Sequence, residues 1–368
     1  MKVGNKILGM AVGQKSIHIA EVSSKGSSYA VSVCAEFVFP EGLSLSTPDK
    51  LGHELQKFLK AKQFSTKEVV MGLPAKRLVT RRKEIPAANA ATAATVLRVQ
   101  AEGEFSSELD NLIMDFAGTP SIAEPSTVLL IATNKVLVDE CRTMAEAAGL
   151  RVAAITSTTA ALGRATSRLP GGDGLVLNMG PTGAELVIQH GLLPAHLRHL
   201  NMAGGGESVS MLANEIRRTV AAIPRNGTPM TLALWNSSEA ENPQSVLEQR
   251  LAMPVTMPNV TNLVSTGSQD TRGYAPAVAL ALSAMESGLA VDFLHSRLAP
   301  PKAAGMSLQK RLAILGGIVV VSIVGYGYYD LSNKQADLDN VQASITKQSK
   351  PVAIADQQIQ RFDAARSW

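Results

Sequence analysis

Two glycine-containing turns are the part of the sequence best suited to holding a ligand through the backbone. The first covers residues 12–16 (VGQKS) and the second covers residues 179–183 (MGPTG). Each joins two apolar segments, which predicts consecutive strands with a tight turn between them. Hairpins of this kind, one in each half of a chain, can bind the phosphates of a nucleotide with backbone N–H groups. An ordinary hairpin turn explains each of the two sequences alone, so the prediction of a phosphate site depends on their order and spacing in the chain.

A third glycine cluster, residues 204–206, precedes a segment with helical periodicity. The N-terminus of such a helix can face an anion, because its first N–H groups have no partner within the helix. A capping turn explains this cluster equally well. Together the three turns give one set of candidate pocket residues: Gly13, Gln14, Lys15, Ser16, Gly180, Thr182, Gly205 and Glu207.

Other side chains do not form a pattern typical of catalysis or metal binding. His190, His196 and His199 are close in sequence, but no arrangement of carboxylates accompanies them. Cys34 and Cys141 lie in apolar segments without a CxxC spacing, so we interpret them as buried, reduced thiols. We therefore expect no catalytic residue and no metal site.

Charge and composition argue against a nucleic-acid partner. The net charge is +4 over 368 residues and 4% of residues are aromatic, so neither a basic stripe nor a stacking platform is indicated. One basic group, Arg77 with residues 81–83, flanks a predicted strand. It is either a solvated strand edge or a contact for anionic lipid or an acidic partner.

The framework for these turns is an alternation of strands and helices over the first 290 residues. Apolar runs and two-residue alternation predict strands, and apolar residues three to four apart predict helices. The expected strands are two within 6–21, then 29–39, 68–73, 77–83, 111–116, 128–132, 152–155, 174–178, 184–189, 230–234 and 255–257. The expected helices are 51–62, 87–103, 135–148, 158–167, 208–222, 245–251 and 275–287.

An uncharged apolar segment at residues 312–329 predicts one transmembrane helix. It is just long enough for a hydrocarbon core of about 30 Å, and tyrosines gather at its C-terminal end. Arg297, Lys302, Lys310 and Arg311 precede it, and Asp330 follows. The positive-inside rule then places residues 1–311 in the cytoplasm. A buried helix of a soluble protein is the alternative.

The remaining residues, 330–368, have the spacing of a short coiled coil. Leu331, Leu338 and Ile345 recur every seven residues, and Val341 occupies a second seam position. Pro351 is expected to break this helix, with a new helix after it. We expect this tail to lie in the periplasm and to begin a longer region.

Four segments resemble actin-like proteins, and PilM in particular. Residues 8–23 look like the opening strand pair of that fold, and residues 174–191 look like its second phosphate hairpin. Residues 69–86 look like the inserted subdomain of PilM-type and FtsA-type members. Residues 128–165, with strand, helix, "AGL", strand and helix, are similar to PilM and are the most specific of the four. The resemblance implies an α/β, actin-like two-lobed domain over residues 1–290, with an inserted small α+β subdomain at about 45–120.

The segment that follows resembles the start of PilN-type partners, which docks onto PilM. It reads VDFLHSRLAPP at residues 291–301. The resemblance implies a docking motif and basic linker over 291–311, ahead of the membrane helix, in a layout also similar to GspL of type II secretion. The partner-binding residues that it implies are Val291, Asp292, Phe293, Leu294 and Leu298.

Three departures from the actin-like pattern predict a degenerate nucleotide pocket. Ala11 stands where active members carry an Asp that places the metal and water. Asn178 stands at the second Asp position, where an amide lacks the charge that holds Mg²⁺. Trp235 replaces small residues near the expected purine pocket. We include Asn178 among the residues that a bound nucleotide would contact, and ATP is the one cofactor that the resemblance makes possible.

The function that follows is a membrane-anchored scaffold of a type IV pilus or type II secretion inner-membrane assembly. Its partners would be other assembly proteins of that membrane and a cytoplasmic motor ATPase, with self-association or heteromer formation through the membrane helix and tail. Two alternatives remain open on the same fold: an active ATPase, and an FtsA-like filament protein at the membrane.

Overall fold

The computed structural model describes residues 4–366 except 27, 106–108, 172–173, 181–182, 203–207, 223–229, 237–242, 268–269, 287 and 300–307. The chain divides into two units, Met1–Pro300 and Pro301–Trp368. The first unit is the body, which carries the candidate sites. The second is a helix.

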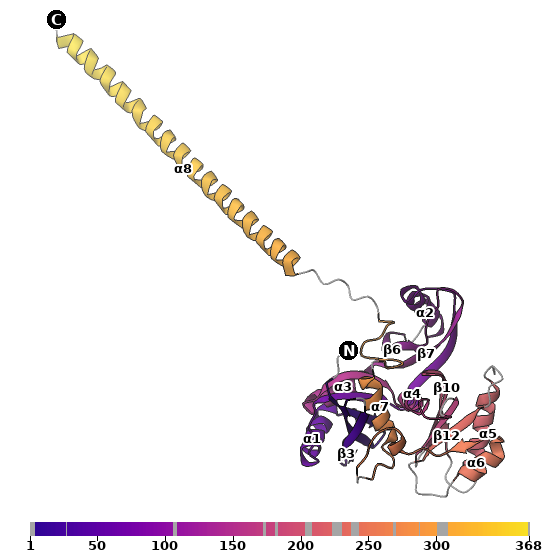
Figure 1. The fold of residues 1–368 in the computed structure, drawn as a ribbon. Helices are drawn as coiled ribbons and strands as arrows, with labels where there is room; N and C mark the ends of the chain where they lie inside the picture. The colour runs from indigo at the N-terminus through magenta and orange to yellow at the C-terminus, as the bar shows by residue number, and fades with distance from the viewer. Residues whose placement is uncertain are drawn as a thin grey trace. The chain divides into compact units, whose positions relative to one another are not determined.

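The body is built on two five-stranded sheets with the same strand order (Figure 1). In each sheet three antiparallel strands are followed by two parallel ones. The first sheet is β3 (Ser28–Val38), β2 (Ser16–Lys25), β1 (Lys6–Val12), β4 (Glu68–Leu73) and β8 (Arg151–Ser157). The second is β11 (Leu193–Asn201), β10 (Gly183–His190), β9 (Gly174–Gly180), β12 (Thr231–Asn236) and β13 (Val255–Thr256). This duplication confirms the expected α/β framework with two halves, which we call the first and second lobes.

Helices bury the apolar faces of both sheets. In the first lobe α1 (Pro48–Ala61) packs against α3 (Lys135–Ala147), and α7 (Ala275–Met285) packs on β1, β2 and β4. Residues 275–284 of α7 are all buried, as expected for a helix that is apolar on every side. In the second lobe α5 (Ser208–Ala221) and α6 (Gln244–Leu251) contact each other.

One helix, α4 (Thr158–Thr166), contacts both lobes. It leaves the end of β8 and lies against α7 and β4 in the first lobe and against β9, β10 and β11 in the second. Close approach is possible because Gly163 has no side chain: a Cβ there would lie 1.9 Å from Nε2 of Gln189. The two lobes therefore share a tightly packed helix.

The inserted unit has boundaries that differ from the expected 45–120. Its antiparallel sheet is β5 (Leu78–Ile85), β7 (Ser126–Asn134) and β6 (Leu112–Ala117), and α2 (Ala90–Glu104) packs against β5. Helix α1 and strand β4 belong to the first lobe, because Leu51, Leu55 and the apolar residues of β4 are buried in its core. Strand β7 lies at the centre of the small sheet, although it was expected after the insertion.

Strand β11 was not predicted from the sequence. It reads LPAHLRHLN, and its polar residues obscure the alternation that buries Leu197 and Leu200. The strand lies at an edge of the second sheet, where a proline near its start is tolerated.

The second unit contains α8 (Leu308–Arg366), and the expected break at Pro351 is wrong. Figure 1 shows one continuous rod. A proline removes one N–H donor and crowds the preceding turn, and residues with good helix propensity on both sides can absorb that cost. Side chains are not described for residues 312–316, 318–319 and 327–328 of the expected membrane segment. Within the described part of the chain, no helix combines the length and apolar character that crossing a membrane requires.

The contact between β1 and α7 gives a testable consequence of this packing. A Cβ on Gly9 would lie 1.8 Å from the carbonyl oxygen of Ala277, and no side-chain rotation can relieve an overlap with backbone. We expect Gly9→Ala to lower the free energy of unfolding by about 3 kcal/mol or more. Gly103, at an exposed position of α2, is the matched control, because a Cβ added there would have no atom within 4 Å. Gly103→Ala should be neutral or stabilising by up to about 1 kcal/mol. Denaturant unfolding measures both, and a Gly9→Ala protein as stable as its parent would contradict the packing.

Candidate functional site

The first hairpin forms at the predicted residues, but its turn is closed by its own backbone. The N–H of Gly13 donates to the carbonyl oxygen of Ser16 at 2.8 Å, and the carbonyl oxygen of Lys15 accepts from Phe39 N–H at 2.8 Å. Gln14 lines a hollow of about 510 Å³ beside Lys76 and Arg77. Ala11 lies in β1, paired with His18 and Gly72.

The second hairpin also forms where the sequence predicted it. Gly180, the last residue of β9, pairs with Gly183, the first residue of β10. Asn178 is flanked in the sheet by Glu185 on β10 and Trp235 on β12. Thr182, Gly205 and Glu207 lie outside the described residues.

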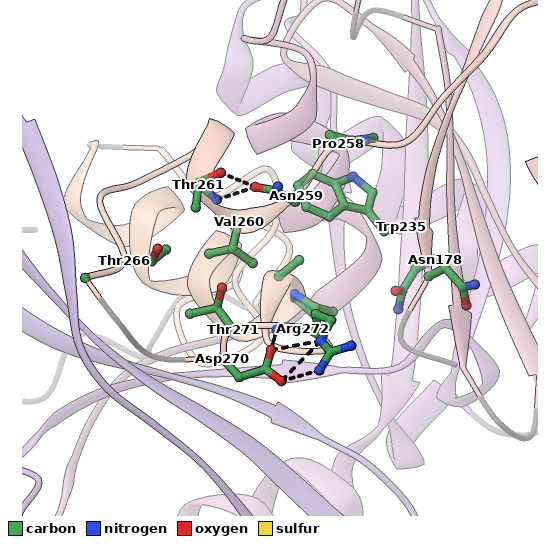
Figure 2. Close-up of a pocket in the computed structure, with 15 residues that line it drawn as sticks. Asn178, Trp235, Pro258, Asn259, Val260, Thr261, Thr266, Asp270, Thr271 and Arg272 are labelled. Carbon is green, nitrogen blue, oxygen red and sulfur yellow. Dashed lines mark hydrogen bonds and ion pairs between the residues drawn. The ribbon is translucent and has the colours of Figure 1, made fainter. Parts of the chain in front are cut away.

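Asn178 and Trp235 line a cavity of about 410 Å³ at the end of the second sheet. The remaining wall comes from Asn236 and from residues within 258–267 and 270–276, the stretch that leads into α7. Figure 2 shows Asn178 and Trp235 on one side of this cavity and the Asp270–Arg272 pair on another. Trp235 is 3% exposed and its Nε1 donates to Thr166 Oγ1 at 2.9 Å, so the indole is held against α4.

The charged groups of this cavity neutralise each other. Arg272 donates from Nε to both carboxylate oxygens of Asp270, at 3.0 and 3.1 Å, and from a terminal nitrogen at 2.7 Å. Hydrogen bonds from the side chain and backbone N–H of Arg272 lower the pKa of Asp270 to about 2. Asp270 is the one carboxylate among the described residues that line the cavity. A metal ion would have to compete with Arg272 for it.

The structure thus divides the predicted pocket residues. Asn178 lines one cavity together with Trp235, the residue expected to crowd the pocket, whereas Gln14 lines a separate hollow. Sequence reasoning missed the wall formed by residues within 258–267 and 270–276, where Asn259 caps a short turn by accepting from Thr261 N–H at 2.8 Å. Short runs of Asn, Thr and Gly of this kind predict a loop, but they do not indicate that the loop lines a cavity.

A second candidate site is the groove in which residues 291–299, the docked segment, lie against the body. Thr156 Oγ1 donates to the carbonyl oxygen of Val291 at 2.7 Å, and the N–H of Phe293 donates to the carbonyl oxygen of Ile155 at 2.7 Å. Val291 and Phe293 are 1% and 2% exposed and belong to the core of the first lobe. The segment therefore adds backbone hydrogen bonds and two apolar anchors at the end of β8.

Asp115 of β6 is the polar centre of the groove. Its side chain is 2% exposed, and Arg297 Nε donates to its Oδ1 at 3.0 Å while the N–H of Asp292 donates to Oδ2 at 2.9 Å. Burial raises the pKa of Asp115, and the charge of Arg297 and these hydrogen bonds act in the opposite direction. The Arg297 guanidinium also lies 4.1 Å from the ring centre of Phe116, a cation–π contact.

The end of the docked segment binds the inserted unit. Leu298 is 4% exposed and joins a core cluster with Leu97 and Phe116. Arg98 of α2 donates to the carbonyl oxygens of Leu298 and Ala299, at 3.0 and 2.8 Å. Leu294 is half-buried and lines a hollow beside β6. One short segment thus contacts both the first lobe and the inserted unit.

Comparisons with known proteins agree with this geometry. Residues 9–174 match the family model for type IV pilus assembly protein PilM. No curated protein matches the chain. A solved PilM-PilN type IV pilus biogenesis complex is similar at 20% identity with a TM-score of 0.65, over 76% of this chain and 98% of that one. The cytoplasmic domain of EpsL, an inner-membrane component of the type II secretion system of Vibrio cholerae, is similar at 13% identity and a TM-score of 0.47, over 80% and 99% of the two chains. Residues 9–174 are therefore similar to the PilM family, and the body has the fold of the PilM-PilN structure.

Proposed function

We propose that this chain is a membrane-anchored actin-like scaffold of a type IV pilus or type II secretion inner-membrane assembly, working through protein contacts. The observation that carries the proposal is the docked segment. Its contacts fix the chain's exit from the body, just ahead of the expected linker and membrane helix. A scaffold of this kind requires a defined attachment to its anchor and does not require catalytic activity.

The docked segment is held by the chain's own connectivity. Helix α7 ends at Met285, and Val291 is already buried a few residues later. Such a short connection gives the segment a high effective concentration at its groove, so a separate copy from another chain competes poorly. The similar solved structure is a complex of PilM with PilN. We propose that this chain joins a PilM-like body and a PilN-like segment in one polypeptide.

The anchor is the apolar stretch at residues 312–329, with the body on the cytoplasmic side and residues 330–368 on the other. The helical tail continues past Pro351, so Val352 and Ile359 extend the seven-residue spacing of Leu331, Leu338 and Ile345. Leu338, Ile345 and Ile359 are exposed on α8. This row of apolar residues suits pairing with a second copy or with another assembly protein of the same membrane. Such pairing would connect contacts made by the body on one side of the bilayer to partners on the other side.

A catalytic ATPase is the second candidate, favoured by the cavity beside Asn178 and Trp235. Against it, Ala11 and Asn178 lack the carboxylates that hold a metal, and Asp270 is already paired with Arg272. We therefore assign the body a structural role.

The docked segment is tested by introducing charge at its apolar anchor. Phe293→Asp places a carboxylate in the first-lobe core, so the segment should leave its groove and proteases should cleave between residues 286 and 311. Leu294→Asp, at a half-buried position, should give a smaller increase in cleavage. Ile122→Asp, at a residue that is 79% exposed, is the control and should leave the digestion pattern unchanged. Unaltered protection of the Phe293→Asp protein would count against docking.

The anchor is tested by fractionation of cells that express the full chain. We expect the chain to remain with membranes through a mild salt wash and to need detergent for release. Substituting both Val320 and Ile323 with Asp should move it to the soluble fraction, because each charge at the centre of a membrane helix costs about 2.5–3.5 kcal/mol. A parent chain that is soluble without detergent would contradict the proposal.

Calorimetry with ATP and Mg²⁺ separates the scaffold from the ATPase. We expect weak binding or none, and no phosphate release above a blank. Tight binding together with turnover would overturn the structural assignment in favour of the enzyme.

A further inference from the structure

Glu185 connects the two lobes through a single carboxyl group. It lies on β10 of the second sheet, and its Oε1 accepts from the N–H of Ala75 at 2.8 Å. Its Oε2 accepts from Thr159 Oγ1 at 2.5 Å. Ala75 follows β4, and Thr159 lies in the first turn of α4, directly after β8. Both donors therefore come from the ends of first-lobe strands.

The surroundings make these bonds strong. Glu185 is half-buried, and burial raises its pKa while the bonds from Thr159 and Ala75 act in the opposite direction. Ala75 and Thr159 are 6% and 1% exposed, so water does not compete freely for either donor. A carboxylate near the N-terminus of α4 also gains from the helix dipole. Charge-assisted hydrogen bonds of this kind are about twice as strong as neutral ones.

We propose that Glu185 is a latch that holds the two lobes in one fixed arrangement and keeps them from moving apart. Neighbouring contacts act in the same direction. Thr80 Oγ1 of the inserted unit donates to the carbonyl oxygen of Leu197 on β11 at 3.2 Å, and Trp235 is bonded to Thr166 of α4. Glu185 differs from these because one side chain accepts from residues that closely follow two separate first-lobe strands, β4 and β8. Removing it frees both at once.

The latch is independent of the docked segment and of any membrane anchor. Its role is to make the body behave as a rigid block, so that a load on one lobe is passed to the other without loss. It also removes the lobe motion that a nucleotide-driven cycle on this framework would use.

The test measures the distance between the lobes in the full chain in detergent. Spin labels at Lys57→Cys on α1 and Arg218→Cys on α5 report it, since these side chains are 73% and 77% exposed. Burial raises the pKa of Cys34 and of Cys141 to about 12, so the native thiols react slowly at neutral pH. Pulsed electron–electron double resonance should give one narrow distribution of distances between the two labels for the chain with Glu185 intact.

Glu185→Ala should broaden this distribution and shift it to longer distances. Thr159→Val, which removes one donor at constant shape, should broaden it less, and Thr159→Ser should restore the narrow form. Glu21→Ala is the matched control, because Glu21 is a buried carboxylate whose bonds to the N–H groups of Ser65 and Thr66 stay within the first lobe.

Two outcomes would overturn the latch. The first is that the distance distributions of the Glu185→Ala and Thr159→Val proteins both match that of the parent. The other is a Glu21→Ala protein that broadens as much as Glu185→Ala, which would indicate general loosening. If Glu185→Ala does not fold, the comparison of Thr159→Val with Thr159→Ser decides.

Discussion

The buried carboxylate of Asp115 is the constraint on which the arrangement of this body depends. A carboxylate in that position is costly unless it is paired, because a charge left buried without a partner loses its hydration without compensation. The partners come from the docked segment: the guanidinium of Arg297 and the N–H of Asp292. The inserted unit therefore holds a site that is complete once residues 292–297 lie in the groove. Apolar anchors such as Phe293 supply most of the burial, and Asp115 sets the register.

Glu185 is a second carboxylate that connects separate parts of the body, but its partners are of a different kind. Asp115 is paired with a cation, whereas Glu185 accepts from an N–H and a hydroxyl at the ends of two first-lobe strands. One carboxylate attaches the exit segment and the other joins the lobes. Together they give a body whose parts are held by polar contacts at defined positions, and such contacts favour one geometry over others more than they add stability. A fixed geometry suits a scaffold, and among the described residues that line the nearby cavity the one carboxylate, Asp270, is paired with Arg272.

The sequence predicted those elements whose burial leaves a regular pattern. Strand β4 occurs at the predicted residues, and α3 begins at Lys135 as expected, since Asn134 caps it. Strand β11 was missed because His196, Arg198 and His199 interrupt its apolar alternation. The inserted unit was misplaced because pairing between distant strands, such as β5 with β7, leaves no local signal. The groove depends on such pairing too: Asp115 and Arg297 are far apart in sequence, and neither looks unusual alone.

If residues 312–329 anchor the chain as proposed, the docked segment also sets how far the body can lie from the membrane. With Leu298 fixed in the inserted unit, the chain between it and residue 312 spans at most about 50 Å when fully extended. If the segment were free, the tether would begin at the end of α7, near Met285, and could reach about 90 Å. Docking therefore nearly halves the reach of the linker, and helical residues from Leu308 onward shorten it further. Entropy alone favours release of a flexible tether, so the hydrogen bonds of Asp115 and the burial of Phe293 and Leu298 must outweigh it.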